Sequence, residues 1–203
     1  MRAKSIKGTS PDEIKTALLL STTDGFNPTL AIVFLSTKQD RTAISRMLDE
    51  EGIAVFGVTT HGEFTSEGIT QKSVAILLLD LNRDFFTITF TEFAEKNYRQ
   101  VTQSIAKKVL EKFAHPAFLI AGSNLETDAE ELLHGIEDII GLQANVWGGM
   151  AGDDFSFTEQ FVFTNKESSN RGIVTLALDE DKILVKGKAT CGWKPMGTDK
   201  TVT

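Results

Sequence analysis

Two periodicities of apolar residues alternate along this chain, and this alternation limits the possible folds more than any other feature. Nearly continuous apolar runs of strand length occur at residues 29–36, 53–60, 73–80, 116–123 and 172–179. Between these runs, apolar residues recur every three or four positions, which is typical of helices that cover a sheet. The pattern predicts the α/β class, with mixed sheets and flanking helices.

The ends of the expected helices are marked by capping residues. Ser10 and Glu13 form a capping box that opens a helix after an N-terminal edge strand. Gly52 and Gly141 end two further helices, because glycine tolerates the left-handed conformation that often follows a last helical turn. A fourth helix is expected within residues 97–114, where apolar residues form one face.

The order of these elements indicates an internal duplication with approximate two-fold symmetry. A strand, a helix, a strand and a hairpin occur twice, at about residues 29–93 and 116–190 of a domain that spans residues 1–203. The hairpins that close the two units are predicted at residues 73–93 and 172–189. We expect the two units to superpose.

A glycine followed by an acid stands at the same place in each unit. These pairs are Gly62–Glu63 and Gly152–Asp153. Each pair follows the glycine that ends the preceding helix by a similar distance, ten residues in the first unit and eleven in the second. Both pairs would lie at the carboxyl ends of equivalent strands, where open α/β sheets usually form their sites. We therefore expect the two turns to face one shared cleft.

The residue types at this cleft suit a small molecule. Glycine lets a ligand approach the backbone closely and leaves N–H groups free to meet a carboxylate. An acid can hold an ammonium group, and an indole ring can form an apolar wall. The residues expected to bind the ligand are His61, Gly62, Glu63, Gly149, Gly152, Asp153 and Trp193.

Other interpretations of these residues remain open. In the simplest one, the glycines only form strained turns and the acids only cap them. Asp153 and Asp154 offer hard oxygen ligands for Mg²⁺, but no third carboxylate stands at a suitable spacing. The glycines lack the lysine and hydroxyl of a phosphate-binding loop. Cys191 is a candidate nucleophile, although a lone thiol is more often buried and inert. We assign no catalytic residue, metal or cofactor.

The charge of the chain argues against some classes of partner. Its formal net charge is −7 and its pI is near 5.0, and it has no basic stripe, so nucleic acid is not an expected partner. The N-terminus lacks the apolar segment of a signal peptide, and the longest apolar run is interrupted by Asp80, so membrane insertion is not expected. The single cysteine fits a reducing compartment, and we expect a cytoplasmic protein.

Residues 55–69, the apolar strand at 73–79 and residues 146–163 resemble the FIST domain, specifically its N-terminal part. The resemblance runs from about Leu30 to the C-terminus, and the two Gly-acid turns are its most specific marks. It implies an intracellular sensory module of prokaryotic signal transduction that binds a small ligand such as an amino acid. A ligand-binding role without turnover follows from the resemblance; the alternatives are a metal-dependent or thiol hydrolase or transferase, and a protein-interaction module without a ligand.

Proteins of this kind normally continue into a FIST C-terminal domain. This chain ends at Thr203, so we expect that domain to be absent and a following strand to be interrupted. No receiver, kinase or methyl-accepting segment is recognisable. The resemblance therefore implies that the signal passes to a FIST C-terminal domain or to a separate signalling protein.

Overall fold

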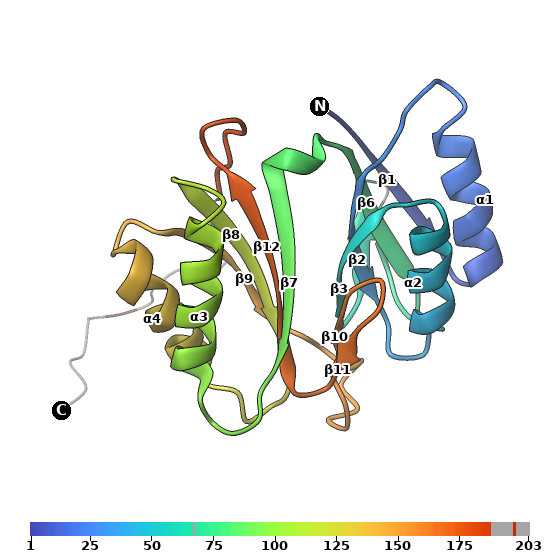
Figure 1. Cartoon of the computed structure of the whole chain (residues 1–203). Coiled ribbons are helices and arrows are strands. Elements are labelled where there is room, and N and C mark those ends of the chain that lie inside the picture. Colours follow the sequence, from blue (N-terminus) through green and yellow to red (C-terminus); the bar gives the residue numbers. More distant parts are fainter. Residues whose placement is uncertain (67, 188–196, 198–203) are drawn as a thin grey trace.

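Two mixed β-sheets lie face to face, and each carries two helices on its outer side (Figure 1). The computed structural model describes residues 1–66, 68–187 and 197. Helices α1 (Pro11–Ser21) and α2 (Arg41–Glu50) cover the first sheet, and α3 (Tyr98–Leu110) and α4 (Ala129–Ile140) cover the second. This four-layer arrangement confirms the predicted α/β class with mixed sheets and flanking helices.

The first sheet contains six strands within the described residues. Strands β2 and β3 are parallel, while β6 runs antiparallel to both of its neighbours, β1 and β2. The strand order is β1 (Arg2–Gly8), β6 (Val74–Asp80), β2 (Leu30–Leu35), β3 (Ala54–Thr59), β10 (Val162–Phe163), β11 (Ser168–Ser169). The Ser10 hydroxyl caps α1 by accepting from the Glu13 N–H at 3.3 Å, as the sequence predicts.

The second sheet has the same succession of strand directions. Strands β8 and β9 are parallel, and β12 runs antiparallel to both of its neighbours, β7 and β8. The order is β7 (Phe86–Glu92), β12 (Gly172–Asp179), β8 (Pro116–Gly122), β9 (Asn145–Met150). A separate short hairpin joins β4 (Glu63–Thr65) to β5 (Gly68–Thr70), and a 3₁₀ turn, η1 (Arg83–Phe85), precedes β7.

The prediction that a hairpin closes each repeat is wrong. Strands β6 and β7 lie in different sheets, and residues 181–187 form no strand. Strand β7 therefore corresponds in its pairing to β1, because each is the outer antiparallel neighbour of its sheet. The sheet boundaries accordingly differ from the units expected at residues 29–93 and 116–190. Superposition of the two halves stays a prediction.

Three apolar clusters hold the four layers together. The first lies between α1, α2 and the first sheet, and the second lies between α3, α4 and the second sheet. The third joins the two sheets. Strand β12 is apolar at most positions because both of its faces are buried. Ile173 and Ala177 belong to the cluster that faces the helices, whereas Val174 and Leu176 belong to the cluster between the sheets. A strand whose two faces are both buried needs apolar residues at both.

Candidate functional site

The turn that follows β3 is organised around Glu63, which is only 1 % exposed. Its Oε1 accepts a hydrogen bond from the Thr60 hydroxyl at 2.8 Å. Its Oε2 accepts from the backbone N–H of Ser73 at 3.1 Å and from the Ser73 hydroxyl at 2.8 Å. Gly62 precedes it with a φ of +88°, a conformation that favours glycine. Three protein donors thus occupy the carboxyl group and tie the turn to the start of β6.

The turn that follows β9 is organised around Asp153 in a similar way. Asp153 is 4 % exposed, and its Oδ2 accepts from the backbone N–H of Thr158 at 2.7 Å. Its backbone carbonyl accepts from the N–H and hydroxyl of Ser156, at 3.0 and 2.8 Å. The carboxyl group therefore closes a loop on the C-terminal side of the turn.

The two turns are in direct contact. The N–H of Gly152 donates to the carbonyl of Thr59 at 2.7 Å, and the Thr59 hydroxyl donates back to the carbonyl of Gly152 at 2.7 Å. A methyl group at Gly152 would lie 3.0 Å from the backbone nitrogen of His61, so the close approach depends on glycine. The end of β3 and the turn after β9 therefore touch, whereas a cleft shared by the two turns stays a prediction.

The loop after Asp153 contains three non-glycine residues in the left-handed region of φ. The φ angles are +57° at Asp154, +61° at Phe155 and +51° at Phe157. Such angles are uncommon for residues with bulky side chains. Asp154 reaches the loop after β2, where its Oδ2 accepts from the hydroxyl of Ser36, and Phe155 packs edge-on against the ring of His61. These contacts hold the strained loop against the first sheet.

The family of the chain follows from a comparison with known protein families. The FIST N domain family matches residues 29–203. The chain belongs to this family. A search of curated proteins finds no match. FIST domains are sensory domains of signal transduction, and the resemblance based on the two turns is confirmed at the level of the family.

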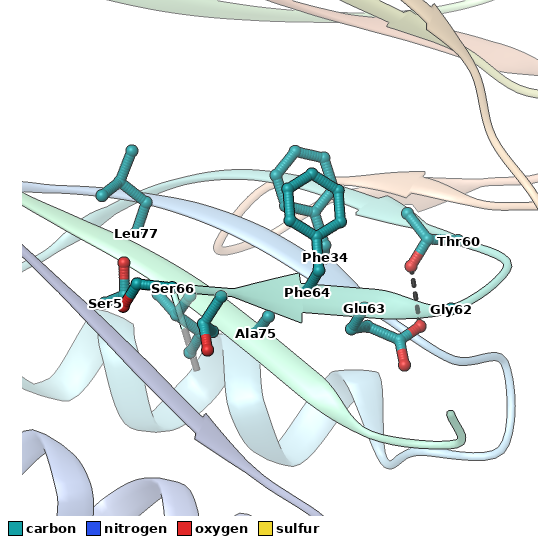
Figure 2. A pocket seen from close by; sticks show the side chains of 11 residues that line it. Ser5, Phe34, Thr60, Gly62, Glu63, Phe64, Ser66, Ala75 and Leu77 are labelled. Atoms are coloured by element: carbon teal, nitrogen blue, oxygen red, sulfur yellow. Dashed lines mark hydrogen bonds between the residues drawn. The ribbon is translucent and has the colours of Figure 1, made fainter. Parts of the chain in front are cut away.

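The residues of this FIST N domain that were expected to bind a ligand do not all line one cavity. Gly62 and Glu63 line a mainly apolar cavity of about 530 Å³ between the β4–β5 hairpin and the first sheet. Figure 2 shows Glu63 among the residues that line this cavity, with its carboxyl group bonded to Thr60. Gly149 lines a different apolar cavity, of about 430 Å³, beside α4. Trp193 lies outside the described residues.

The acids of both turns have protein donors, which gives each of them a structural role in the FIST N domain. This geometry agrees with the interpretation that the acids cap their turns. Contact of Glu63 or Asp153 with a ligand stays a prediction. Thr59, Thr60 and Ser73 are not among the residues expected at the site, since hydroxyl residues are common in such segments and their partners are set only by the fold.

A half-buried arginine beside the strained loop was also missed. The guanidinium carbon of Arg41 lies 3.9 Å from the centre of the Phe161 ring, a cation–π arrangement. Burial lowers the pKa of the Arg41 guanidinium below its ordinary value, and the nearby carboxylates of Glu159 and Asp40 oppose that shift. The Nε of Arg41 is buried without a hydrogen-bond partner in the described part of the chain. Glu159 thus lies within electrostatic reach of α2.

The described residues contain no group of three or more His, Cys, Asp or Glu side chains placed to hold a metal ion. Asp153 and Asp154 accept hydrogen bonds from different segments, Thr158 and Ser36. Cys191 lies outside residues 1–66, 68–187 and 197. Over the same described residues, no helix has the length and apolar character needed to cross a bilayer.

Proposed function

We propose that this FIST N domain is the ligand-binding input of a signalling protein and that it binds a small molecule such as an amino acid. The observation that carries the proposal is the way in which Asp153, from one Gly-acid turn, and Thr59, at the end of β3, hold residues 158–161. Asp153 binds the N–H of Thr158, and the Thr59 hydroxyl accepts from the N–H of Phe161 at 2.9 Å. The two sheets thus fix both ends of one short polar segment.

The strained loop next to this segment supports a functional role. Residues in sparsely populated backbone conformations cost about 1–3 kcal/mol each and are found most often at ligand clamps and active sites. Here three such residues stand between Asp153 and Thr158. The surrounding contacts hold the loop, since Asp154 is bonded to Ser36 in the first sheet and Asp153 is bonded within the loop.

The signal is proposed to leave the domain through a FIST C-terminal domain or a separate signalling protein in the cytoplasm. A ligand that binds across the two sheets can alter their relative packing, because the Thr59–Gly152 bonds join the end of β3 to the segment after β9. A ligand shifts the equilibrium between two arrangements of the sheets only if it binds one arrangement more tightly than the other. The proposal therefore requires a ligand that contacts segments from both sheets.

A thermal-shift screen of the 203-residue chain against amino acids and central metabolites tests the proposal. A ligand that binds only the folded state adds about 2.7 kcal/mol of stability at 100 times its Kd. For a domain of this size, that corresponds to a rise in Tm of roughly 5–11 °C. Calorimetry on the hit then gives stoichiometry. The proposal is overturned if no compound in the screen raises the Tm and none binds in calorimetry.

A further inference from the structure

The β4–β5 hairpin lies over one end of the first sheet and leaves a cavity beneath it. Strand β4 contacts β6 and β1, the two strands at that end of the sheet. The cavity between the hairpin and these strands, called the hairpin cavity below, has a volume of about 530 Å³. Small-molecule sites in proteins usually measure about 300–1,000 Å³, so the hairpin cavity has the size of such a site.

The floor of the hairpin cavity is a part of the first sheet that the second sheet does not cover. Phe34 stands opposite Ala75 on one side and opposite Val58 on the other, so these three side chains share one face of the sheet. Val58 belongs to the cluster between the two sheets and is 4 % exposed, whereas Phe34 is 38 % exposed. Leu77, two residues along β6 from Ala75, points to the same face. The apolar face that meets the second sheet at β3 thus continues under the hairpin.

The hairpin supplies an aromatic wall of the cavity. Phe64 of β4 lines the cavity and is 76 % exposed, and Ile69 stands directly opposite it in β5 and is 81 % exposed. Exposed apolar side chains that gather in this way mark ligand grooves or interaction sites. Phe34 from the sheet and Phe64 from the hairpin therefore bring two rings to one cavity (Figure 2).

The base of the hairpin is fixed to the sheet. The Thr70 hydroxyl donates to the backbone carbonyl of Glu63 at 3.1 Å, and it lies 2.7 Å from the hydroxyl of Ser73, at the start of β6. The Glu63 carboxyl group accepts from the Ser73 N–H and hydroxyl. These bonds set the position of Phe64, which follows Glu63 directly, so the ring is held at the edge of the cavity.

The hairpin cavity offers nothing that would neutralise a charged ligand. Of the described residues that line it, Glu63 alone has an ionisable side chain, and this carboxyl group is 1 % exposed with both oxygens bonded to protein donors. Lys7 stands opposite Ala75 but does not line the cavity and has an interaction of its own. The polar groups left for a ligand are the hydroxyls of Ser5 and Ser66, both at exposed residues. Burial of a charge without a partner is costly, so the ligand must be neutral.

We propose that the hairpin cavity binds a neutral aromatic molecule that carries one hydroxyl or N–H group. The ring would pack over Ala75 and Leu77, between the rings of Phe34 and Phe64, where offset or edge-on aromatic contacts are favourable. The polar group would meet one of the two serine hydroxyls. The inference goes beyond the proposed function, because none of residues 158–161 lines this cavity and the ligand is not an amino acid.

Titration calorimetry on the full chain, with indole and naphthol as probes, tests the inference. Indoleacetate and L-tryptophan carry the same ring as indole together with charged groups. We expect both to bind at least about tenfold more weakly than indole, because the cavity has no free partner for their charges.

Two variants test the walls of the cavity. Ser5→Trp places an indole ring in the cavity from an exposed position on an edge strand, where an aromatic residue is tolerated, and should weaken the probes by at least about tenfold. Phe64→Ser removes one wall and should weaken them by about two- to tenfold. Leu142→Ser is the control: Leu142 is 84 % exposed and does not line the cavity, so this variant should bind normally.

A second readout locates the ligand. When indole is added, the methyl signals of Ala75 and Leu77 should shift in carbon–proton spectra, because an aromatic ring changes the magnetic field at nearby protons. The methyl signals of Leu132, which lies between α4 and the second sheet, should stay in place. In Ser5→Trp, addition of indole should no longer move the Ala75 and Leu77 signals.

The outcomes are decisive for this site and separate from those of the metabolite screen. The inference is overturned if neither indole nor naphthol binds, or if both bind Ser5→Trp and Phe64→Ser as tightly as the parent. Equal affinity for indole and L-tryptophan would refute the requirement for a neutral ligand. If Phe64→Ser fails to fold, Ser5→Trp decides the matter, since it leaves the hairpin unchanged. The proposed function is judged by amino acids and metabolites, so either proposal can fail without the other.

Discussion

Glu63 provides the sharpest test of how the turn after β3 is built. In Glu63→Gln, the amide oxygen can keep facing the Ser73 N–H and hydroxyl, and the amide NH₂ would face the Thr60 hydroxyl, which can rotate to accept. Charge-assisted bonds become neutral ones, which are roughly half as strong. Because each bond to a charged group is worth about 1.5–3 kcal/mol, we expect a loss of about 1–2 kcal/mol, allowing for the bonds that remain.

Glu63→Ala should be more damaging, because no acceptor remains for the backbone N–H of Ser73. Orphaning that buried donor costs about 1–3 kcal/mol, and the space left by the side chain adds a cavity cost, so we expect a loss of about 3–5 kcal/mol. Urea unfolding gives both values. Glu50→Gln, at an exposed glutamate on α2 without a described polar contact, is the control and should change stability by less than about 0.5 kcal/mol. Equal stability of Glu63→Gln, Glu63→Ala and the parent would refute the structural role of this carboxyl group.

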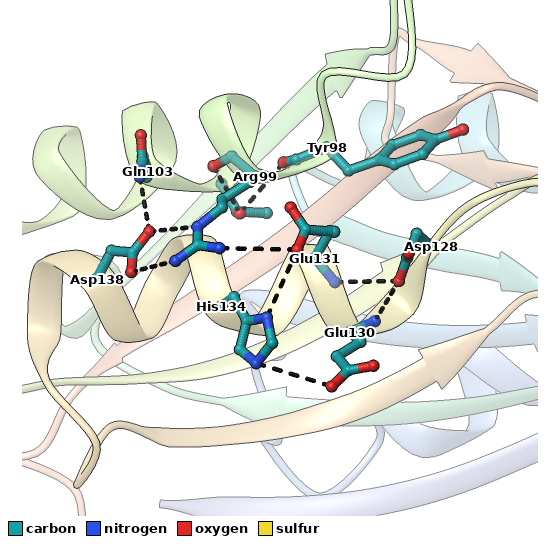
Figure 3. Close-up of polar contacts among 9 residues, drawn as sticks. Tyr98, Arg99, Gln103, Asp128, Glu130, Glu131, His134 and Asp138 are labelled. Atoms are coloured by element: carbon teal, nitrogen blue, oxygen red, sulfur yellow. Dashed lines mark hydrogen bonds and ion pairs between the residues drawn. The ribbon is translucent and has the colours of Figure 1, made fainter.

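Three further predictions concern the glycine pair, one ion pair and the internal repeat. Gly148→Ala should destabilise the fold by about 1–3 kcal/mol or more, since the φ of Gly148 is +148° and a methyl group there would lie 1.9 Å from the carbonyl oxygen of Ile120. Gly149→Ala should be nearly neutral, because a methyl group at Gly149 would have no neighbour within 4 Å. Thermal melts compare the two variants, and equal melting points would contradict the argument. Hydrogen bonds, first from Arg99 and then from Gln103, lower the pKa of Asp138 from 3.8 to about 2 (Figure 3). The stability that this carboxylate contributes is therefore present above pH 3.8 and is lost as the pH falls through about 2. Melts of Asp138→Asn and the parent should differ at neutral pH and converge near pH 2, and a constant difference would exclude this linkage. Residues 2–80 should superpose on residues 86–179 with Gly62 near Gly152; an experimental structure in which the matched strands run differently would contradict the duplication.

The fold class was predictable because it depends on local patterns. A strand buried on both faces is apolar at successive positions, as in β12, and a helix on a sheet is apolar every three or four. The neighbour with which a strand pairs cannot be predicted from such a local pattern. Strands β6 and β7 are separated by a short link, Leu81–Phe85, which suits a hairpin equally well. In the protein, Leu81 and Phe86 are buried between the sheets, so the chain crosses from one sheet to the other.

The need for glycine in the two turns was also predictable. Gly62 has a positive φ, and a methyl group at Gly152 would lie 3.0 Å from the backbone nitrogen of His61. The partners of the acids were not predictable. Glu63 is bonded to Ser73, ten residues along the chain and beyond the β4–β5 hairpin, and only the closure of that hairpin brings the two together.

The burial of Gln160 had no recognisable signal in the sequence, although its side chain is only 8 % exposed. It stands beside Glu159 and before the apolar residues Phe161 and Val162, where a glutamine would ordinarily be expected at the surface. Its Oε1 is buried without a hydrogen-bond partner in the described part of the chain. A buried polar group with a missing partner is visible only once those contacts are in place.

The bonds of Glu63 and Asp153 limit the part that the recognisable motif can play in ligand binding. Glu63 and Asp153 are bonded to protein donors, so a ligand that used them would first have to break bonds that hold the turns. A turn that must keep its shape needs satisfied acids, whereas a site that must bind and release a molecule needs groups that are unsatisfied when the pocket is empty. The turn after β9 and the end of β3 therefore hold the backbone where the two sheets meet, and we expect a ligand to contact groups other than the carboxylates of Glu63 and Asp153.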